Sequence, residues 1–371
     1  MSDKIRILHM IGSLGIGGSQ AFVMNIYRKI DRDKMQFDFI VDTPKNNHYV
    51  SEIEGLGGKV YYFPKFNGKN LSKVRRTWKN FFSEHKEYKV LHSHVRSYAS
   101  IYLPVARNAG VKTIIHSHNN SNGSGMIAFG KYLLQLPLRF QADYYMACSK
   151  AAGEWLFGKK ICNSERFQVV KNAINTSDYV FNEQNRKLIR AEFGLTDEFV
   201  LGYLARVTEQ KNPLFVVDVM KELITINPHS ILLFVGDGEL LNAVRERVQQ
   251  LGISDSVIFT GARTDVGSLL AAMDCYILPS IWEGLGISLI EAQAAGLPCI
   301  CSNGIQDEAI VTNLVKCYPL NIGAEKWASE IADINMIVGR ENMSASIKQA
   351  GFDIDETVNV LQEIYKKMVT I

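Results

Sequence analysis

The most informative part of the chain is Ser280-Ile-Trp-Glu-Gly-Leu-Gly-Ile-Ser-Leu-Ile-Glu291, which follows the apolar run 275–279. Two carboxylates, Glu283 and Glu291, flank a pair of glycines and an apolar run of helical character. The pattern predicts a buried strand, a tight turn and a helix. Glycines leave the N–H groups at a helix start open to an anion, and carboxylates accept hydrogen bonds from sugar hydroxyls. The stretch therefore predicts a site for a sugar joined to a diphosphate.

Short apolar segments alternate with helical segments along the whole chain. This alternation is typical of parallel, doubly wound α/β sheets with helices on both faces. The expected strands are residues 4–11, 36–42, 59–63, 90–94, 112–116, 144–148 and 167–170, and then 200–204, 231–235, 257–260, 275–278 and 298–301. We therefore expect two Rossmann-like domains, residues 1–174 and 175–354, with a closing helix at 355–371 that packs back on the first.

Composition favours a globular protein of the cytoplasm. The chain has 371 residues, of which 47% are hydrophobic, and no run reaches the roughly 18 apolar residues of a membrane span. The start of the chain lacks the features of a signal peptide. The cysteines are scattered without the paired spacing of a metal site, which favours reduced thiols. They are Cys148, Cys162, Cys275, Cys299, Cys301 and Cys317.

Charge is distributed unevenly between the two halves. Residues 1–175 hold 26 basic and 12 acidic residues, whereas residues 176–371 hold 15 and 26. The densest basic patch is 65–82, with six basic and no acidic residues. Its apolar residues recur at near-helical spacing, so it predicts either a helix that lies on an anionic membrane or an ordinary helix packed on its sheet. No recognition motif for nucleic acid accompanies the charge.

Polar and glycine residues gather where the strands of the first half end, which is where ligands bind in doubly wound sheets. A glycine loop at 12–18 follows the first strand, and Asp42 ends the second. Asp42 could be the acid that binds a dinucleotide ribose, so an NAD-dependent enzyme stays an alternative, although the glycine loop does not fit G-x-G-x-x-G. Three histidines end two further strands, beside a group of small polar residues, and predict a functional cluster. The histidines are His94, His116 and His118, and their polar neighbours are Ser93, Ser117, Asn119 and Asn120.

Two cationic side chains follow the first strand of the second half. Arg206 ends that strand and Lys211 lies five residues later. A guanidinium and an ammonium at a strand end can neutralise a diphosphate leaving group. The run Gly236-Asp-Gly-Glu239 ends the next strand and predicts an edge that binds the base or the ribose.

These motifs resemble the signature of the family 4 retaining glycosyltransferases of GT-B fold. The resemblance rests on Arg206 with Lys211, on the run 236–239 and on the two acids of 283–291, and it spans nearly the whole chain in the right order. The run Ile-His-Ser-His-Asn at 115–119 is similar to the bacterial capsule and exopolysaccharide enzymes. Trp282 replaces the usual Phe or Tyr before the first acid, a small departure.

The resemblance implies roles for individual residues. Arg206 and Lys211 would stabilise the charge that builds on the diphosphate, and Glu283 would orient the donor sugar. The other implied donor contacts are Gly17, Gly18, Gly236, Gly238, Glu239, Gly284, Leu285, Gly286, Ile287 and Glu291, the last holding the ribose. His116 or His118 would be the catalytic histidine, and we favour His116. His94 and Asn119 would lie on the acceptor side.

The resemblance implies transfer of a hexose or N-acetylhexosamine from a nucleotide sugar, with a UDP-linked sugar as the expected donor, to a glycan or lipid-linked glycan. The two domains would face each other across a cleft, and no metal or other cofactor is expected. The implied location is the cytoplasm, with the inner face of the plasma membrane as an alternative. Two further interpretations stay open, a nucleotide-sugar epimerase of the same fold and a non-catalytic partner subunit.

Overall fold

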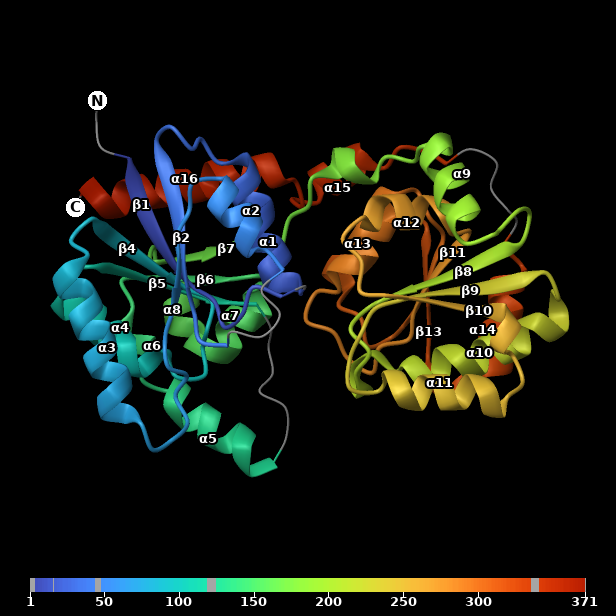
Figure 1. Ribbon diagram of the computed structural model, residues 1–371, viewed down its shortest axis with the longest axis horizontal. Coiled ribbons are helices and arrows are strands. Elements are labelled where there is room, and N and C mark those ends of the chain that lie inside the picture. The colour runs from blue at the N-terminus through green and yellow to red at the C-terminus, as the bar shows by residue number, and fades with distance from the viewer. Residues whose placement is uncertain (1–3, 16, 44–47, 119–124, 335–339, 371) are drawn as a thin grey trace. The chain divides into compact units, whose positions relative to one another are not determined.

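The computed structural model of the chain describes residues 4–15, 17–43, 48–118, 125–334 and 340–370. The contacts of the chain divide it into two compact units (Figure 1). The first unit consists of residues 1–173 and 354–371, and the second of residues 174–353. Ile174, which the sequence prediction assigned to the first domain, belongs to the second unit, because its N–H donates to the Phe352 carbonyl at 3.0 Å and its side chain packs in the second unit's core.

The first unit is built on a seven-stranded parallel sheet with the strand order β3-β2-β1-β4-β5-β6-β7. The strands are β1 (Ile5–Met10), β2 (Met35–Val41), β3 (Val60–Tyr62), β4 (Tyr88–Ser93), β5 (Lys112–Ser117), β6 (Tyr144–Ala147) and β7 (Phe167–Val169). The helices are α1 (Gly18–Lys29), α2 (Val50–Gly55), α3 (Leu71–Glu84), α4 (Ala99–Asn108), α5 (Gly125–Gln135), α6 (Leu138–Gln141), α7 (Lys150–Phe157), α8 (Lys159–Cys162) and α16 (Ile354–Thr370).

Both faces of this sheet are buried, because successive strand residues point to opposite faces. Ile7 of β1 packs in the core under α1 and α16, and the next residue, Leu8, packs in the core under α3 and α4. The closing helix α16 lies beside α1 (Figure 1). Val358 and Leu361 of α16 are among the buried residues of that core.

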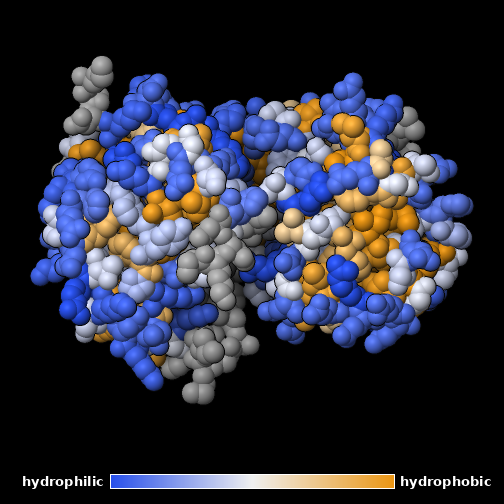
Figure 2. Space-filling view, in the orientation of Figure 1, coloured by the Kyte–Doolittle hydropathy of each residue, from blue (hydrophilic) through white to orange (hydrophobic). Residues whose placement is uncertain are grey.

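Residues 71–82 of the basic segment lie in helix α3, which turns four apolar side chains to the core. Val74, Trp78, Phe81 and Phe82 are at most 7% exposed. The hydrophobic stripe is therefore used inside the unit, as in an ordinary helix packed on its sheet. The basic side chains lie on the opposite, solvent face, and Figure 2 shows mainly hydrophilic residues over this part of the unit. The exposed basic residues of α3 are Lys73, Arg75, Arg76 and Lys79.

The second unit is built on a six-stranded parallel sheet with the order β10-β9-β8-β11-β12-β13. The strands are β8 (Phe199–Leu204), β9 (Ser230–Val235), β10 (Val257–Gly261), β11 (Cys275–Leu278), β12 (Cys299–Ser302) and β13 (Val315–Tyr318). The α-helices are α9 (Glu183–Glu192), α10 (Pro213–Ile226), α11 (Leu241–Gln250), α12 (Val266–Ala272), α13 (Ile287–Ala294), α14 (Ala324–Ala332) and α15 (Ser344–Gln349). Short 3-10 turns are η1 (Thr176–Tyr179), η2 (Glu209–Lys211), η3 (Ser254–Ser256), η4 (Asp307–Ala309) and η5 (Leu320–Ile322).

Strand β13 was missing from the sequence prediction, which ended the second sheet at 298–301. The strand Val-Lys-Cys-Tyr is short and lies at the edge of the sheet, where none of its residues is fully buried. Lys316 interrupts the apolar residues of this four-residue strand, so it lacks the continuous apolar run that is typical of the buried strands.

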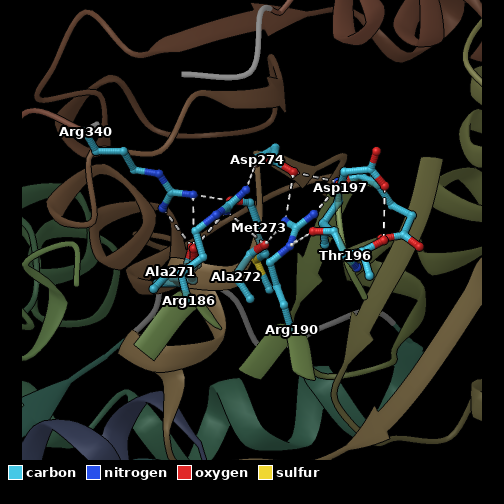
Figure 3. A network of polar contacts seen from close by, with 12 residues as sticks. Arg186, Arg190, Thr196, Asp197, Ala271, Ala272, Met273, Asp274 and Arg340 are labelled. Atoms are coloured by element: carbon cyan, nitrogen blue, oxygen red, sulfur yellow. Dashed lines mark hydrogen bonds and ion pairs between the residues drawn. The ribbon is translucent and has the colours of Figure 1, made fainter. Parts of the chain in front are cut away.

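A polar network surrounds Asp274, which directly precedes β11 at its amino end (Figure 3). Asp274 accepts hydrogen bonds from Arg186 at 2.6 Å and from the Val200 N–H at 2.8 Å, and it pairs with Arg190 at 3.4 Å. Arg186 and Arg190 also donate to carbonyls of 271–273, which end helix α12. Cations at a helix C-terminus satisfy its last carbonyls and complement its dipole. Asp274 therefore anchors two arginines that fasten α9 to α12.

Among the described residues, no helix combines the length and the apolar character that a membrane crossing requires.

Candidate active site

The turn between β11 and α13 presents Glu283 at the carboxyl end of the second sheet. The Glu283 N–H donates to the Gly304 carbonyl at 3.0 Å, and the Ile281 N–H donates to the Gln210 carbonyl at 2.8 Å. Gly286 precedes α13 with φ 70°, in the left-handed region that favours glycine. Gly304 is required for a different reason, because a Cβ there would lie 2.4 Å from the Ile281 carbonyl oxygen. The turn is thus held from both sides by neighbouring loops.

The Glu283 carboxylate is 4% exposed and is bound through one oxygen. Its Oε1 accepts a hydrogen bond from the Ser280 hydroxyl at 2.7 Å and forms an ion pair with Lys211 Nζ. Its Oε2 accepts no hydrogen bond from the part of the chain that the structure describes. The carboxylate is therefore oriented by two partners while one oxygen remains open to a ligand hydroxyl. Lys211 comes from η2, so the pair joins two neighbouring loops.

Arg206 lies two residues beyond β8, and its side chain is exposed. Within the described ranges, its guanidinium has no hydrogen bond or ion pair. A guanidinium has five donors in a planar fork that matches phosphate oxygens. Arg206 and Lys211 thus differ, because only Lys211 already has an acidic partner. The sequence predicted both cations for this strand end, and both lie on the loop that follows β8.

Gly236 and Gly238 are required by the close approach of two backbone loops. Gly236 has φ 143°, and a Cβ there would lie 2.0 Å from the Ala205 carbonyl oxygen. At Gly238 a Cβ would lie 2.4 Å from the Val207 carbonyl oxygen. Two backbone loops therefore touch on either side of Arg206, and glycine is needed for that approach. Glu239 is exposed beside them. The assignment of these residues to donor binding stays a prediction.

Glu291 lies in α13 and is 9% exposed. Burial raises the pKa of its carboxyl to about 7, and a hydrogen bond from the Tyr179 hydroxyl to Oε1, at 2.9 Å, acts in the opposite direction. Tyr179 comes from η1 in the segment that opens the second unit. Sequence reasoning missed Tyr179, since an aromatic residue in a polar turn carries no motif.

The start of α13 lies between the two acids. No side chain caps this helix, so its first N–H groups point outward from Gly286 and Ile287 without a side-chain acceptor. Such a helix start attracts anions. Gly284 is half-buried, and the side chain of Leu285 packs in the core at 5% exposure. Leu285 therefore anchors the turn through its side chain.

In the first unit, the glycine loop leads from β1 into α1. Gly17 precedes the helix with an extended backbone, and Gly18 is its first residue. The Gly12 carbonyl accepts from the N–H groups of Asp42, at 3.3 Å, and Thr43, at 3.0 Å. The Asp42 side chain accepts hydrogen bonds from the Tyr98 and Thr43 hydroxyls. Asp42 thus has protein partners for both carboxylate oxygens, which explains its position without a dinucleotide ribose.

The histidines predicted at the strand ends lie together and are joined by two more. His94 Nδ1 lies 2.8 Å from His118 Nε2, and His94 Nε2 lies 3.0 Å from His9 Nδ1. The third predicted histidine, His116, is linked through His92, because His92 Nε2 lies 3.3 Å from His116 Nδ1. Asn119 and Asn120, predicted beside this cluster, lie outside the described residues. Ser93 and Ser117 bond instead to neighbours within the unit, including Tyr102 and Arg96.

Burial keeps these imidazoles neutral. Burial lowers the pKa of His9 to about 3 and that of His118 to about 4. The pKa values of His92, His94 and His116 are lowered well below the usual value by burial and by the neighbouring imidazoles. A neutral imidazole has one donor and one acceptor nitrogen. Two ring nitrogens of the cluster, His9 Nε2 and His116 Nε2, are buried without a hydrogen-bond partner among the described residues.

Asn172 sets the direction of the hydrogen bonds. Its side-chain oxygen can only accept, so His118 Nδ1 donates to it across 3.3 Å. His118 Nε2 then accepts from His94 Nδ1, and His94 Nε2 accepts from His9 Nδ1. Both nitrogens of His118 and of His94 are therefore occupied within the unit.

The cluster also offers nitrogens in numbers that suit a metal. One nitrogen from each of His94, His116 and His118 lies within 4.8 Å of the others. In the hydrogen-bonded series of His9, His94 and His118, however, the ring nitrogens face each other directly. The planes of the His9 and His94 rings are inclined by only 10°. Lone pairs in that arrangement point at a neighbouring N–H rather than at a common centre, as Zn²⁺ would need. The geometry favours a hydrogen-bonded histidine chain.

Comparison with known proteins places these features in a family. Residues 16–178 match the model "Glycosyltransferase Family 4", and residues 185–333 match "Glycosyl transferases group 1". The putative glycosyltransferase EpsF of Bacillus subtilis (strain 168) is 30% identical over 98% of this chain and 97% of its own length. The chain belongs to glycosyltransferase family 4.

A second relative has a more specific name. The UDP-Gal:alpha-D-GlcNAc-diphosphoundecaprenol alpha-1,3-galactosyltransferase of Escherichia coli is 26% identical over 99% of this family 4 chain and 98% of its own. Among solved structures, Anabaena Alr3699/HepE in complex with UDP and glucose has a TM-score of 0.79 at 18% identity and covers 98% of this chain and 99% of that one. The prediction of a GT-B fold with two Rossmann-like domains is confirmed, as is the predicted family.

Proposed function

We propose that this family 4 glycosyltransferase transfers a hexose or N-acetylhexosamine from a UDP-linked sugar to a glycan or lipid-linked glycan of the cell surface, with retention of the anomeric configuration. The observation that carries the proposal is the Glu283–Lys211 ion pair next to the exposed Arg206 and the uncapped start of α13. The relatives support the donor class, since one is named for UDP-galactose and Alr3699/HepE was solved with UDP-glucose.

The two cations account for the leaving group. As the glycosidic bond breaks, negative charge builds on the diphosphate, and preorganised cations stabilise that charge most. Arg206 has no acidic partner in the described chain, so its whole charge is available to a phosphate. Lys211 shares its charge with Glu283, so it holds the acid in place and supplies a second cation at the same strand end.

The two acids account for the donor's hydroxyls. The open Oε2 of Glu283 would accept a hydroxyl of the sugar, while Oε1 stays fixed by Ser280 and Lys211. Glu291, 9% exposed and ordered by Tyr179, would accept the ribose hydroxyls. The first N–H groups of α13 would receive the phosphates between these two acids. The donor site would be lined at the next strand end by Gly236, Gly238 and Glu239.

A resident metal is not part of the proposal. In many enzymes a divalent cation neutralises a diphosphate, and here Arg206 and Lys211 would supply that charge. The proposed activity should therefore persist in a chelator. A requirement for Mg²⁺ or Mn²⁺ would contradict this part of the proposal.

The first unit would bind the acceptor. His94 would lie on that side, with His116 or His118 as the catalytic histidine, while Gly17 and Gly18 would contact the donor. The occupied nitrogens of His118 support His116 as the better candidate, because His116 contributes only Nδ1 to its bond with His92. The basic face of α3 supports a peripheral contact with an anionic membrane in which the apolar residues take no part.

The test begins with donor binding. Thermal unfolding would be followed in UDP, UDP-sugars, GDP, ADP and NAD without metal, because a specific ligand raises stability. We expect UDP and one UDP-sugar to give the largest shifts. No shift at millimolar ligand would contradict the donor site and favour a non-catalytic partner subunit. Conversion of the donor in the absence of any acceptor would favour an epimerase.

Transfer itself would be followed by nuclear magnetic resonance of the product with the donor thus identified. The proposal expects the anomeric configuration of the donor in the product. Inversion of that configuration would contradict the retaining mechanism while leaving the donor site intact.

A further inference from the structure

Two thiols face each other on neighbouring strands of the second unit. Cys301 of β12 and Cys317 of β13 are partners in the parallel register, and their sulfur atoms lie 2.9 Å apart. Cys301 is fully buried, whereas Cys317 lies half-buried on the strand at the edge of the sheet. An oxidant in solution therefore meets Cys317 before Cys301.

The backbone geometry is suited to a disulfide. Neighbouring strands lie about 4.8 Å apart, which falls within the roughly 4.4–6.8 Å that disulfides span between Cα atoms. Bond formation would shorten the sulfur–sulfur distance from 2.9 Å to about 2.0 Å. Small side-chain rotations provide such a movement, so the sheet need not open.

We propose that Cys301 and Cys317 form an oxidative modification site, which a hydroperoxide converts to an intrachain disulfide. The Cys317 thiolate attacks one peroxide oxygen, the O–O bond breaks, and a sulfenic acid and hydroxide result. The Cys301 sulfur then displaces the sulfenic hydroxyl as water, and its proton leaves with that water. In sum, two thiols and one hydrogen peroxide give one disulfide and two waters.

The site lies next to the support of Glu283. Cys301 precedes Ser302, whose hydroxyl donates to the Ser280 carbonyl. Two residues further on, the Gly304 carbonyl accepts from the Glu283 N–H at 3.0 Å. Closing the disulfide joins β13 to the strand that leads into this contact. The covalent link restrains the strand that leads to the acid that we propose for the donor sugar, so oxidation is expected to lower transfer severalfold, reversibly with a thiol reductant.

The chemical part of the test does not depend on the proposed function. The full chain would be treated with hydrogen peroxide, alkylated and digested for mass spectrometry. We expect a loss of two hydrogens, a fall from six alkylated cysteines to four, and one linked peptide pair containing Cys301 and Cys317. Cys317→Ser should abolish the linked pair. Cys162→Ser, which removes another half-buried thiol in the first unit, should leave it unchanged.

Retention of six free thiols, or oxidation of Cys162 ahead of the pair, would overturn the site. A disulfide that forms without altering transfer in a proven donor assay would overturn its link to the Glu283 loop. Failure of the donor assay with an intact disulfide would count against the proposed function alone.

Discussion

His94 donates a hydrogen bond from Nδ1 to Nε2 of His118 over 2.8 Å, and both rings are neutral. The bond joins the ends of β4 and β5 and continues to His9 in β1. A proton added to His94 or His118 would turn an acceptor into a donor and place two N–H groups face to face. The cluster is therefore stable only while its histidines stay unprotonated.

The first prediction concerns acid stability. The pKa of His9 is lowered to about 3 and that of His118 to about 4, below the 6.5 of an unfolded histidine. The unfolded chain then binds more protons, so the free energy of unfolding should fall as the pH drops from about 6.5 towards 4. Each such histidine contributes about 1.4 kcal/mol per pH unit in that window.

Denaturant unfolding at pH 7.5, 5.5 and 4.5 measures this slope. His118→Gln should make the slope shallower, whereas His229→Gln, at an exposed site in the second unit, should leave it as it was. Equal slopes in the two variants would contradict the neutral cluster.

The second prediction concerns Arg186 and Arg190, which pair with the buried Asp274 (Figure 3). Asp274→Asn should lower the free energy of unfolding by about 3–5 kcal/mol, because Arg186 and Arg190 would lose their buried counter-charge. Asp218→Asn breaks a more exposed pair with Arg247 and should cost less than about 1 kcal/mol. Chemical denaturation of the three proteins measures both values, and similar losses would argue against the anchoring role of Asp274.

The third prediction separates the site ion pair from a surface pair. Glu283→Gln should lower transfer by about 10²- to 10³-fold, because the sugar loses an oriented carboxylate and Lys211 loses its partner. The exposed pair of Glu183 and Lys187, at 3.9 Å, provides matched controls as Glu183→Gln and Lys187→Ala. Steady-state rates and far-ultraviolet circular dichroism would be measured together. Full activity of Glu283→Gln in a folded protein would remove Glu283 from the site.

The fourth prediction concerns Tyr179. Glu291 has a pKa of about 7, which the Tyr179 hydroxyl holds down against burial. If the ionised acid accepts the ribose hydroxyls, UDP affinity should fall as the pH drops through about 7. Tyr179→Phe should move that fall to higher pH and weaken binding about tenfold at neutral pH.

Calorimetric titration of UDP between pH 6 and 8.5 measures both effects. Tyr318→Phe removes a comparable hydroxyl that donates to Glu330 on the same unit and should leave the profile in place. A pH-independent affinity in the parent protein would contradict the role of Glu291.

The fifth prediction concerns α3. Because its apolar side chains are buried, vesicle binding through this helix should be electrostatic and should weaken strongly with salt. Replacing Lys73, Arg75, Arg76 and Lys79 by Gln should reduce binding to anionic vesicles, by about 1 kcal/mol for each charge lost. Sedimentation with phosphatidylglycerol vesicles at two salt concentrations measures this. Unchanged binding would assign α3 to a structural role alone.

The fold was predictable from sequence because buried parallel strands are continuous apolar runs. Such runs identified the buried strands, and the half-exposed edge strands β3 and β7 of the first sheet were predicted as well, whereas β13 at the edge of the second sheet was missed. The candidate site residues could be named from sequence because glycines and charges at strand ends are local patterns, and their roles stay predictions. His9 and His92 were missed as part of the cluster, although they are register partners in β1 and β4. The order of strands in the sheet decides which residues of different strands lie side by side. The residue pattern within one strand does not predict that order.

The hydrogen bond from Tyr179 to Glu291 has a thermodynamic consequence. Tyr179 lies in η1, a few residues after the point where the chain passes from the first unit to the second. Coupling between binding and conformation is reciprocal. A ligand that competes with Tyr179 for Glu291 would change the conformational stability of η1. A change in the conformation of η1 would in turn alter the affinity for that ligand by the same factor. The connecting segment is thus part of the binding equilibrium at Glu291.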